Sequence, residues 1–379
     1  MKSVYDKKEL CSGCGACSHN CGLNAIQMKS DEEGFFYPVI NQELCVDCGK
    51  CRRLCPFVKG NTKDGIPKVY AAKNLSDTDR LHSASGGIFT LLSNIVFRNG
   101  GVVYGAVFDS DMQVIHRCAA SVEERNPMRG SKYVQSNLEH IFLQVREDVK
   151  TGKIILFTGT PCQIAGLKAF LGKEYSNLYT CDIVCHGVTS PKIFREYLSY
   201  IEEKYYSKIK NISFRNKEQG WDQQKWKMEL ESGQILLDNK DVNIYKRLFY
   251  SHVIQRPSCH ECPYASIRRP GDITLGDFWG IENSLPDFKD ELGVNVVLVN
   301  TPKGVDFFEK IKDKVSYIES DVKSCLQPQL QYPTKKSKKR EMFWKDYKQK
   351  GFSYVAKKYG MVGFTDRLKG KIKKLIGKS

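Results

Sequence analysis

The chain has 379 residues, 41% of them apolar, which is enough for two or three domains with ordinary globular cores. The longest apolar runs fall far short of the roughly 18 residues that span a bilayer, and the first residues lack an apolar signal, so we expect a cytoplasmic protein. Fifteen cysteines in a protein of a reducing compartment indicate that thiolates bind metal or take part in redox chemistry. They argue against a disulfide framework.

The formal charge of +16 is concentrated at one end of the chain. Residues 334–379 hold 16 Lys and Arg against 3 acids, a net of +13, which leaves +3 for residues 1–333. Composition therefore divides the chain into a cysteine-rich head at 1–60, a mixed body at 65–330 and a lysine-rich tail at 334–379. Because the basic density lies outside the body and no recognition fold accompanies it, we expect no nucleic acid partner.

The head contains two four-cysteine runs of identical spacing. The runs are Cys11, Cys14, Cys17, Cys21 and, 34 residues later, Cys45, Cys48, Cys51, Cys55. In bacterial ferredoxins the fourth cysteine of each run binds the other cluster. We therefore predict one 4Fe-4S cluster on Cys11, Cys14, Cys17 and Cys55, and a second on Cys45, Cys48, Cys51 and Cys21. Two zinc sites are the alternative, although zinc sites usually use separated cysteine pairs. Residues 25–40, between the runs, are predicted to form two short strands around an acidic glycine turn.

The body alternates helical and strand patterns. A helix is predicted at 85–101, and the strand "KIILFTG" is followed by a helix with Thr160 as its N-cap, Pro161 as its first residue and Gly172 as its stop. Further strands are predicted at 177–187 and 293–304. The fold class is therefore a small ferredoxin-like domain, a mixed α/β body and a basic helical tail; the strand order is not predicted.

Several body motifs, taken together and in order, resemble one family. They are "HSASGGIFT", "GGVVYGAVFD", "RGSKYVQS", "FTGTPCQIAGLKAFLG", "CDIVCHGVTSP" and "CPYASIRRPGDITLGDFWGI". With the head, they are similar over about residues 1–330 to the beta subunits of coenzyme F420 hydrogenases and formate dehydrogenases, a family that includes 7-hydroxymethyl chlorophyll reductase. The resemblance implies an FAD in the body that exchanges electrons with the clusters and with an organic acceptor. Clusters move single electrons and hydride acceptors take two, so a flavin between them fits the chemistry.

Small residues at predicted helix N-termini are candidates for binding the FAD diphosphate, because exposed backbone N–H groups bind phosphate. They are Ser83, Ser85, Gly86 and Gly87 in "SASGG", and Thr158, Gly159 and Thr160 in "TGTP". Ordinary helix caps are the alternative. "RGSKY" adds Ser131, Lys132 and Tyr133, with Arg129, as anion partners and a stacking face; a solvated charge pair beside a core tyrosine is the alternative.

Four body cysteines lie in the family motifs, namely Cys162, Cys185, Cys259 and Cys262. They are candidates for a third 4Fe-4S cluster near the flavin, with zinc on Cys259 and Cys262 or plain buried thiols as alternatives. Cys118, Cys181 and Cys325 are expected to be inert. Asp272 and Asp277 with Trp279 form either a loop beside the flavin or a capped strand. His186 is a candidate proton donor or a structural histidine, and no catalytic residue is predicted.

The tail ends in a basic amphipathic pattern. Its apolar face would comprise Phe364, Leu368, Ile372, Leu375 and Ile376, suited to peripheral contact with an anionic membrane or to a partner; a soluble basic end is the alternative.

We therefore expect an iron-sulfur flavoenzyme that takes electrons from ferredoxin or another redox protein and reduces a small organic acceptor. Family members in bacteria without the deazaflavin coenzyme often occur near polysaccharide-biosynthesis genes, which offers a second setting for this acceptor. The alternatives are an electron-transfer subunit without its own substrate and a non-enzymatic iron-sulfur scaffold.

Overall fold

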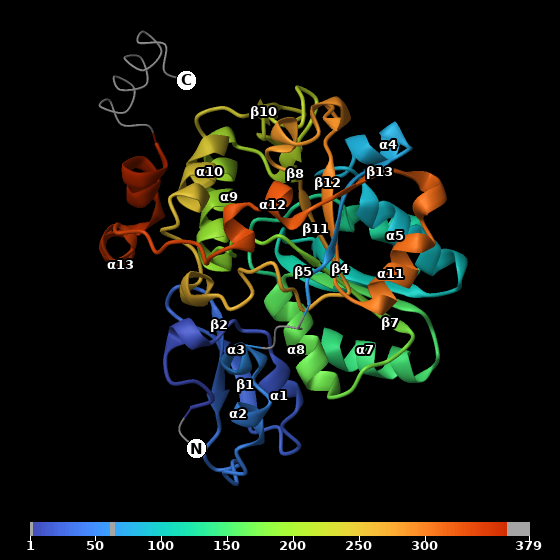
Figure 1. Ribbon diagram of the computed structural model, residues 1–379. Coiled ribbons are helices and arrows are strands. Elements are labelled where there is room, and N and C mark those ends of the chain that lie inside the picture. Colours follow the sequence, from blue (N-terminus) through green and yellow to red (C-terminus); the bar gives the residue numbers. More distant parts are fainter. Residues whose placement is uncertain (1–2, 61–64, 362–379) are drawn as a thin grey trace.

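The computed structural model describes residues 3–60 and 65–361, with the head below the body in Figure 1. The head is built on the antiparallel hairpin of β1 (Ile26–Ser30) and β2 (Phe36–Ile40), as predicted. Gly34, in the turn, has a φ of 86°, a conformation that glycine adopts without a steric penalty. The head's short helices are α1 (Ala16–His19), α2 (Lys50–Arg53) and α3 (Pro56–Lys59).

The body is centred on an eight-stranded mixed sheet of order β13-β3-β12-β11-β7-β6-β4-β5. Strands β4, β6, β7 and β11 run parallel, while β12, β3, β13 and β5 are each antiparallel to their neighbours. The strands are β3 (Lys68–Asn74), β4 (Val102–Phe108), β5 (Val114–Ala119), β6 (Ile155–Gly159), β7 (Leu178–Ile183), β11 (Ile273–Asp277), β12 (Asn295–Val299) and β13 (Val315–Ser320). The predicted strands correspond to β6, β7 and β12.

Helices cover both faces of this sheet, because each strand carries apolar side chains on its two sides. The helices α5 (Ile88–Arg98) and α11 (Pro302–Glu309) share a core with one face. The helices α7 (Ile141–Lys150) and α8 (Pro161–Leu171) share a core with the other face, and Ala16 of the head joins this second core. The remaining short helices around the sheet are α4 (Asp77–Leu81), α6 (Val122–Arg125) and α12 (Val322–Cys325).

The helix α8 has the predicted bounds. Thr160 is the N-cap and forms a capping box with Gln163, Pro161 opens the helix, and Gly172 ends it with a φ of 72°. Since α8 follows β6 directly, its N-terminus lies at the carboxyl end of the parallel strands, where α/β proteins usually bind ligands.

A second unit of the body consists of a three-stranded antiparallel sheet packed with helices. Its strands are β8 (Ile209–Asn216), β9 (Lys225–Leu230) and β10 (Ile235–Leu237), and its helices are α9 (Pro191–Tyr205) and α10 (Val242–Tyr250). Part of the lysine-rich segment joins this core: α13 (Arg340–Val355), which has a non-helical break at Gly351, buries Phe343 and Trp344 in it. A further turn, Ala356–Gly360, follows with π-helical hydrogen bonding.

The mixed α/β fold class with a helical C-terminal region is thus confirmed. The predicted amphipathic face, Phe364 to Ile376, lies outside the described residues. Within the described ranges, no helix combines the length and apolar composition needed to cross a bilayer.

Candidate iron-sulfur sites and binding pocket

The structure brings together the four cysteines predicted for the first head cluster. Cys11, Cys14, Cys17 and Cys55 line one small cavity. Gly13 and Gly15, on either side of Cys14, have φ values of 70° and 76°, which let the loop turn tightly. Burial raises the pKa of Cys14 to about 12, so this thiol keeps its proton unless a cation such as iron replaces it.

The second head set lies nearer the surface. Cys21, Cys45 and Cys51 contact the small core of Val4, Ile26 and Ile40, and the thiol of Cys51 interacts with those of Cys48 and Cys21. Cys48 is exposed, whereas the other cysteines of the chain are half-buried or buried. Across the part of the chain that the structure describes, no three His, Cys, Asp or Glu side chains converge tightly enough to hold a single metal ion.

The four motif cysteines of the body line one cavity between the head and the body. Cys162 lies in the first turn of α8 and Cys185 follows β7, while Cys259 and Cys262 lie in and just after the 3-10 helix Pro257–Glu261. Ser12 and Phe57 of the head also line this cavity. Burial raises the pKa of Cys185 to about 11 and that of Cys262 to about 12.

Three of these sulfurs have hydrogen-bond partners. The backbone N–H of Gly187 donates to Cys185 Sγ and that of Val188 donates to Cys259 Sγ, both over 3.4 Å. The hydroxyl of Thr160 lies 3.2 Å from Cys162 Sγ. Donors directed at sulfur stabilise a thiolate and tune the potential of a cluster bound to it.

The three cysteines expected to be inert lie away from these cavities. Cys325 is buried in a core under β3 and β12, and Cys118 packs beside the core of α7 and α8. Cys181 is buried in the sheet core and also lines the larger pocket described next.

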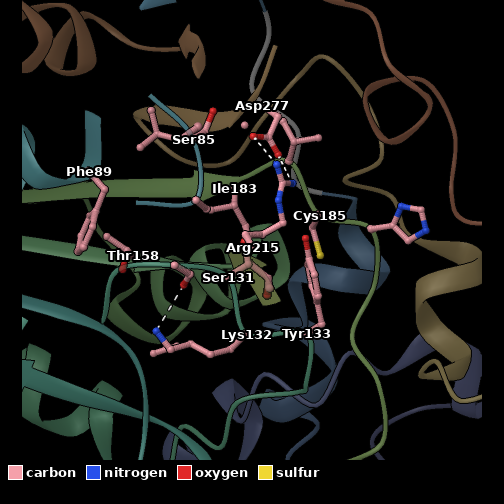
Figure 2. A pocket seen from close by; sticks show the side chains of 18 of the residues that line it. Ser85, Phe89, Ser131, Lys132, Tyr133, Thr158, Ile183, Cys185, Arg215 and Asp277 are labelled. Atoms are coloured by element: carbon pink, nitrogen blue, oxygen red, sulfur yellow. Dashed lines mark hydrogen bonds and ion pairs between the residues drawn. The ribbon is translucent and has the colours of Figure 1, made fainter. Parts of the chain in front are cut away.

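A pocket of about 480 Å³ opens above the carboxyl ends of β6, β7 and β11 (Figure 2). Most of the predicted flavin-binding residues line it, namely Ser83, Ser85, Gly87, Ser131, Lys132, Tyr133, Thr158, Gly159 and Thr160. Gly86 is not among its lining residues: a Cβ at this position would lie 2.4 Å from the carbonyl oxygen of Ala72, so Gly86 serves the close packing of two backbones.

Arg215 and Asp277 form one wall of the pocket. Arg215 Nη1 and Nη2 donate to the Asp277 carboxylate over 2.7 and 3.3 Å, and Figure 2 shows this pair with Lys132 below it in the view. Trp221 Nε1 donates to the same carboxylate over 2.7 Å, and Trp221 stacks on Trp279 with ring centroids 4.7 Å apart. Arg215 was missed by sequence reasoning, because a single arginine in a strand carries no motif.

The two aspartates of the loop have different roles. Asp277 lines the pocket, as does Trp279. Asp272 is buried away from it, where its carboxylate accepts hydrogen bonds from the backbone and hydroxyl of Thr180 and from the hydroxyl of Thr301. The hydrogen bonds of Asp272 therefore link β7 and β11 to the N-terminus of α11. This role agrees with the alternative interpretation, in which the aspartate caps a strand and its turn.

The residues of the "RGSKY" motif do not all fit one interpretation, whether a flavin-binding site or a charge pair beside a core tyrosine. Lys132 donates from Nζ to the carbonyl oxygens of Pro127 and Arg129, and burial lowers its pKa to about 7. Tyr133 lines the pocket while its ring stacks on Phe249 at 4.5 Å, so it is both a wall and a core residue. Arg129 forms an ion pair with Asp79 over 3.3 Å.

His186 lines the pocket as a neutral imidazole. Burial lowers its pKa to about 4, its Nδ1 lies 2.7 Å from the side-chain nitrogen of Gln329, and its Nε2 lies 3.0 Å from Nε2 of His252. At neutral pH this side chain has no imidazolium proton to donate.

Neighbouring cavities share lining residues. Phe57 and Ser12 of the head reach the four-cysteine cavity of the body, and Cys185 lines both that cavity and the larger pocket. α8 packs closely on the first head set, since a Cβ at Gly166 would lie 2.7 Å from Cys14 Cβ.

Comparisons with known proteins identify two parts of the chain. Residues 152–324 match the family described as the C terminus of the beta subunit in coenzyme F420 hydrogenase/dehydrogenase, and residues 10–58 match the 4Fe-4S dicluster domain. The chain is similar to the F subunit of F420H2 dehydrogenase from Methanosarcina mazei, at 22% identity over 322 residues covering 82% of this chain and 85% of the relative. It is also similar to an uncharacterised protein of Methanocaldococcus jannaschii, at 26% identity over 359 residues covering 82% of this chain and 90% of the relative.

A solved structure shows a weaker likeness. It is the xenon-derivatised F420-reducing [NiFe] hydrogenase complex of Methanosarcina barkeri, with 18% identity and a TM-score of 0.45 over 78% of this chain and 91% of that chain. The matches in sequence confirm the predicted family resemblance and the two-cluster head.

Proposed function

We propose that this chain, whose residues 152–324 belong to the family of coenzyme F420 hydrogenase/dehydrogenase beta subunits and whose head is a 4Fe-4S dicluster domain, is an iron-sulfur flavoenzyme. It passes electrons between a low-potential carrier such as ferredoxin and an organic acceptor. The observation that carries the proposal is Cys185, which lines both the four-cysteine cavity and the larger pocket, so that a cluster and a flavin would be neighbours.

The order of the sites gives the order of electron transfer. Electrons enter at the second head cluster, on Cys45, Cys48, Cys51 and Cys21, because Cys48 is exposed to a partner. They pass to the first head cluster, on Cys11, Cys14, Cys17 and Cys55, and then to a third 4Fe-4S cluster on Cys162, Cys185, Cys259 and Cys262. The last step reaches the larger pocket.

The larger pocket fits a flavin by its donors and its position. Lys132 and the backbone around Ser85 and Thr160 suit a diphosphate, and the volume lies within the range of cofactor pockets. FAD bound here would accept single electrons and deliver them in pairs. The chain's own contribution is to bind the diphosphate, to hold Asp277 in place through Arg215, and to exclude water with Tyr133 and Phe249.

Anaerobic analysis of iron, sulfide and flavin per chain tests the proposal. Three clusters require about twelve irons, whereas the head alone requires about eight. Cys259→Ser should lose about four irons, and Cys118→Ser, outside the cavities, should lose none. Equal iron contents in the two variants would contradict the third cluster. A chain that contains no flavin after reconstitution would contradict the proposed flavoenzyme.

A second candidate is an electron-transfer subunit without its own substrate. The observation behind it is the similarity to the relative from Methanosarcina mazei, which is named as one subunit of a dehydrogenase. A reduced chain that turns over no small acceptor yet restores activity to a partner enzyme would favour this candidate. Turnover of an acceptor by the isolated chain, either the deazaflavin coenzyme or one from polysaccharide biosynthesis, favours the enzyme.

A further inference from the structure

A second polar pocket, of about 510 Å³, lies beside the candidate flavin pocket between α4, α5 and α6. Its lining includes Arg98, Arg125, Arg129 and Asp79, together with His82. Arg129 lines both pockets, so the two are neighbours. Nothing in the electron-transfer series uses this second pocket, which we call the arginine pocket.

Arg125 is a buried cation that Asp79 and Glu123 attract without forming a direct ion pair. Its side chain is 1% exposed, and its Nη1 donates to the carbonyl oxygen of Thr90 over 3.1 Å and to the Ser93 hydroxyl. Its Nε is buried and has no hydrogen-bond partner, and no carboxylate of the described residues forms an ion pair with it. A buried charge is costly unless it is paired, so this guanidinium is suited to an anion that enters the pocket.

Two further arginines, Arg98 and Arg129, line the arginine pocket together with the carboxylate of Asp79. Arg98 is exposed on α5 and forms no ion pair with the described residues. Arg129 has Asp79 as its partner, so three guanidinium groups face one carboxylate. Guanidinium groups bind phosphate and carboxylate in preference to other anions, because their paired N–H groups match two oxygens.

We propose that the arginine pocket binds an oxyanion, a phosphate or carboxylate group carried by the organic acceptor. The reducible part of the same molecule would lie beside the flavin at the adjacent pocket, and this identification of the ligand rests on the proposed function. Arg125 lines the arginine pocket and also lies near the flavin pocket. Its guanidinium carbon is 6.0 Å from the centre of the Phe89 ring, and Phe89 lines the flavin pocket.

Titration of the reconstituted, flavin-loaded chain with inorganic pyrophosphate tests the site. We expect saturable binding that Arg98→Gln weakens by about threefold to tenfold. Asp79→Asn should strengthen it by a similar factor, because this change removes the carboxylate that competes with the anion. Arg195→Gln, at an exposed position of α9, should leave it unchanged. Absence of saturable binding, or equal binding by all four proteins, would overturn the proposal.

The same titration without flavin distinguishes the two sources of phosphate. Equal affinity in flavin-free and flavin-loaded protein supports a ligand other than FAD. Pyrophosphate binding that FAD abolishes would assign the arginine pocket to the flavin diphosphate and overturn the proposal. If the chain binds no FAD at all, the proposed function fails, while the flavin-free titration still decides whether the oxyanion site exists.

Discussion

Arg256 of the body donates a hydrogen bond from Nε to the backbone carbonyl of Cys11 in the head over 2.9 Å, across 245 positions of the sequence. Its other nitrogens donate to the carbonyl oxygen of Phe36 and to the side chain of Gln135, each over 3.0 Å, and Nη2 lies 3.9 Å from Cys11 Sγ. One buried guanidinium, three residues before Cys259, therefore fixes the ligand loop of the head against the body.

Replacing Arg256 with Met should destabilise the holoprotein by about 3 kcal/mol, since it leaves two buried carbonyl groups without donors. Arg256→Lys should restore part of this loss, because lysine keeps the charge but not the planar set of donors. Anaerobic denaturant unfolding of the full chain measures the effect. Arg268→Met, at an exposed position, is the matched control, and equal stability of Arg256→Met and this control would contradict the role assigned to Arg256.

Local sequence signals account for the elements that were predicted. The bounds of α8 follow from Thr160, Pro161 and Gly172, whose effects depend on neighbouring residues alone. The order of the eight strands was not predictable, because pairs such as β3 with β12 join segments more than 200 residues apart. The burial of Phe343 and Trp344 was also missed, since a high lysine content concealed apolar residues that pack on α9 and α10.

The candidate sites show the same difference between local signals, which were predictable, and contacts between distant segments, which were not. Spacing and motif residues pointed to the cysteines and to most of the pocket, and all of these are short-range signals. Arg125, Arg215 and Arg256 gave no signal, because each acts through partners from distant segments. A buried arginine is recognisable only when its surroundings are known.

Asp277→Asn should destabilise the protein by about 3 kcal/mol and weaken FAD binding. The change leaves the buried guanidinium of Arg215 without its counter-charge, and removing one partner of a buried pair is far more costly than removing a surface charge. Thermal unfolding and flavin titration of the reconstituted protein measure both effects. Asp287→Asn, at an exposed position, is the control. Unchanged stability in Asp277→Asn would show that the pair does not stabilise the pocket wall.

A chelator should remove the second head cluster before the others. Cys48 is exposed, whereas the cysteines of the first head set and of the body cavity are half-buried and line cavities. We expect a fast loss of about four irons per chain followed by a slower loss of the remainder, measured by iron release under anaerobic conditions. Release of all iron in a single phase would be the contrary result.

Phe343→Ala should destabilise the chain by about 3 to 4 kcal/mol, the usual cost of a cavity in a packed core. Phe343 is fully buried, whereas its neighbour Met342 is 58% exposed, so Met342→Ala is the control and should change stability by less than about 0.5 kcal/mol. Denaturant unfolding measures both. Equal effects of the two substitutions would mean that the lysine-rich segment contributes no residues to the hydrophobic core.

FAD affinity should fall as the pH rises through about 7, because Lys132 is a cation that lines the candidate flavin pocket and can titrate in this range. Burial lowers the pKa of Lys132 to about 7 in the free pocket, and a bound diphosphate would raise this pKa by favouring the ammonium form. Below pH 7 the lysine is charged in both states, so the affinity is constant there. Above pH 7 binding requires uptake of a proton, and the affinity declines until the pH passes the pKa of the bound state.

Flavin titrations from pH 6 to 9 measure this decline. Lys132→Arg should bind FAD with little dependence on pH, since arginine stays charged, and Lys132→Gln should bind it weakly at every pH. A decline of the same slope in Lys132→Gln would assign the titration to another group.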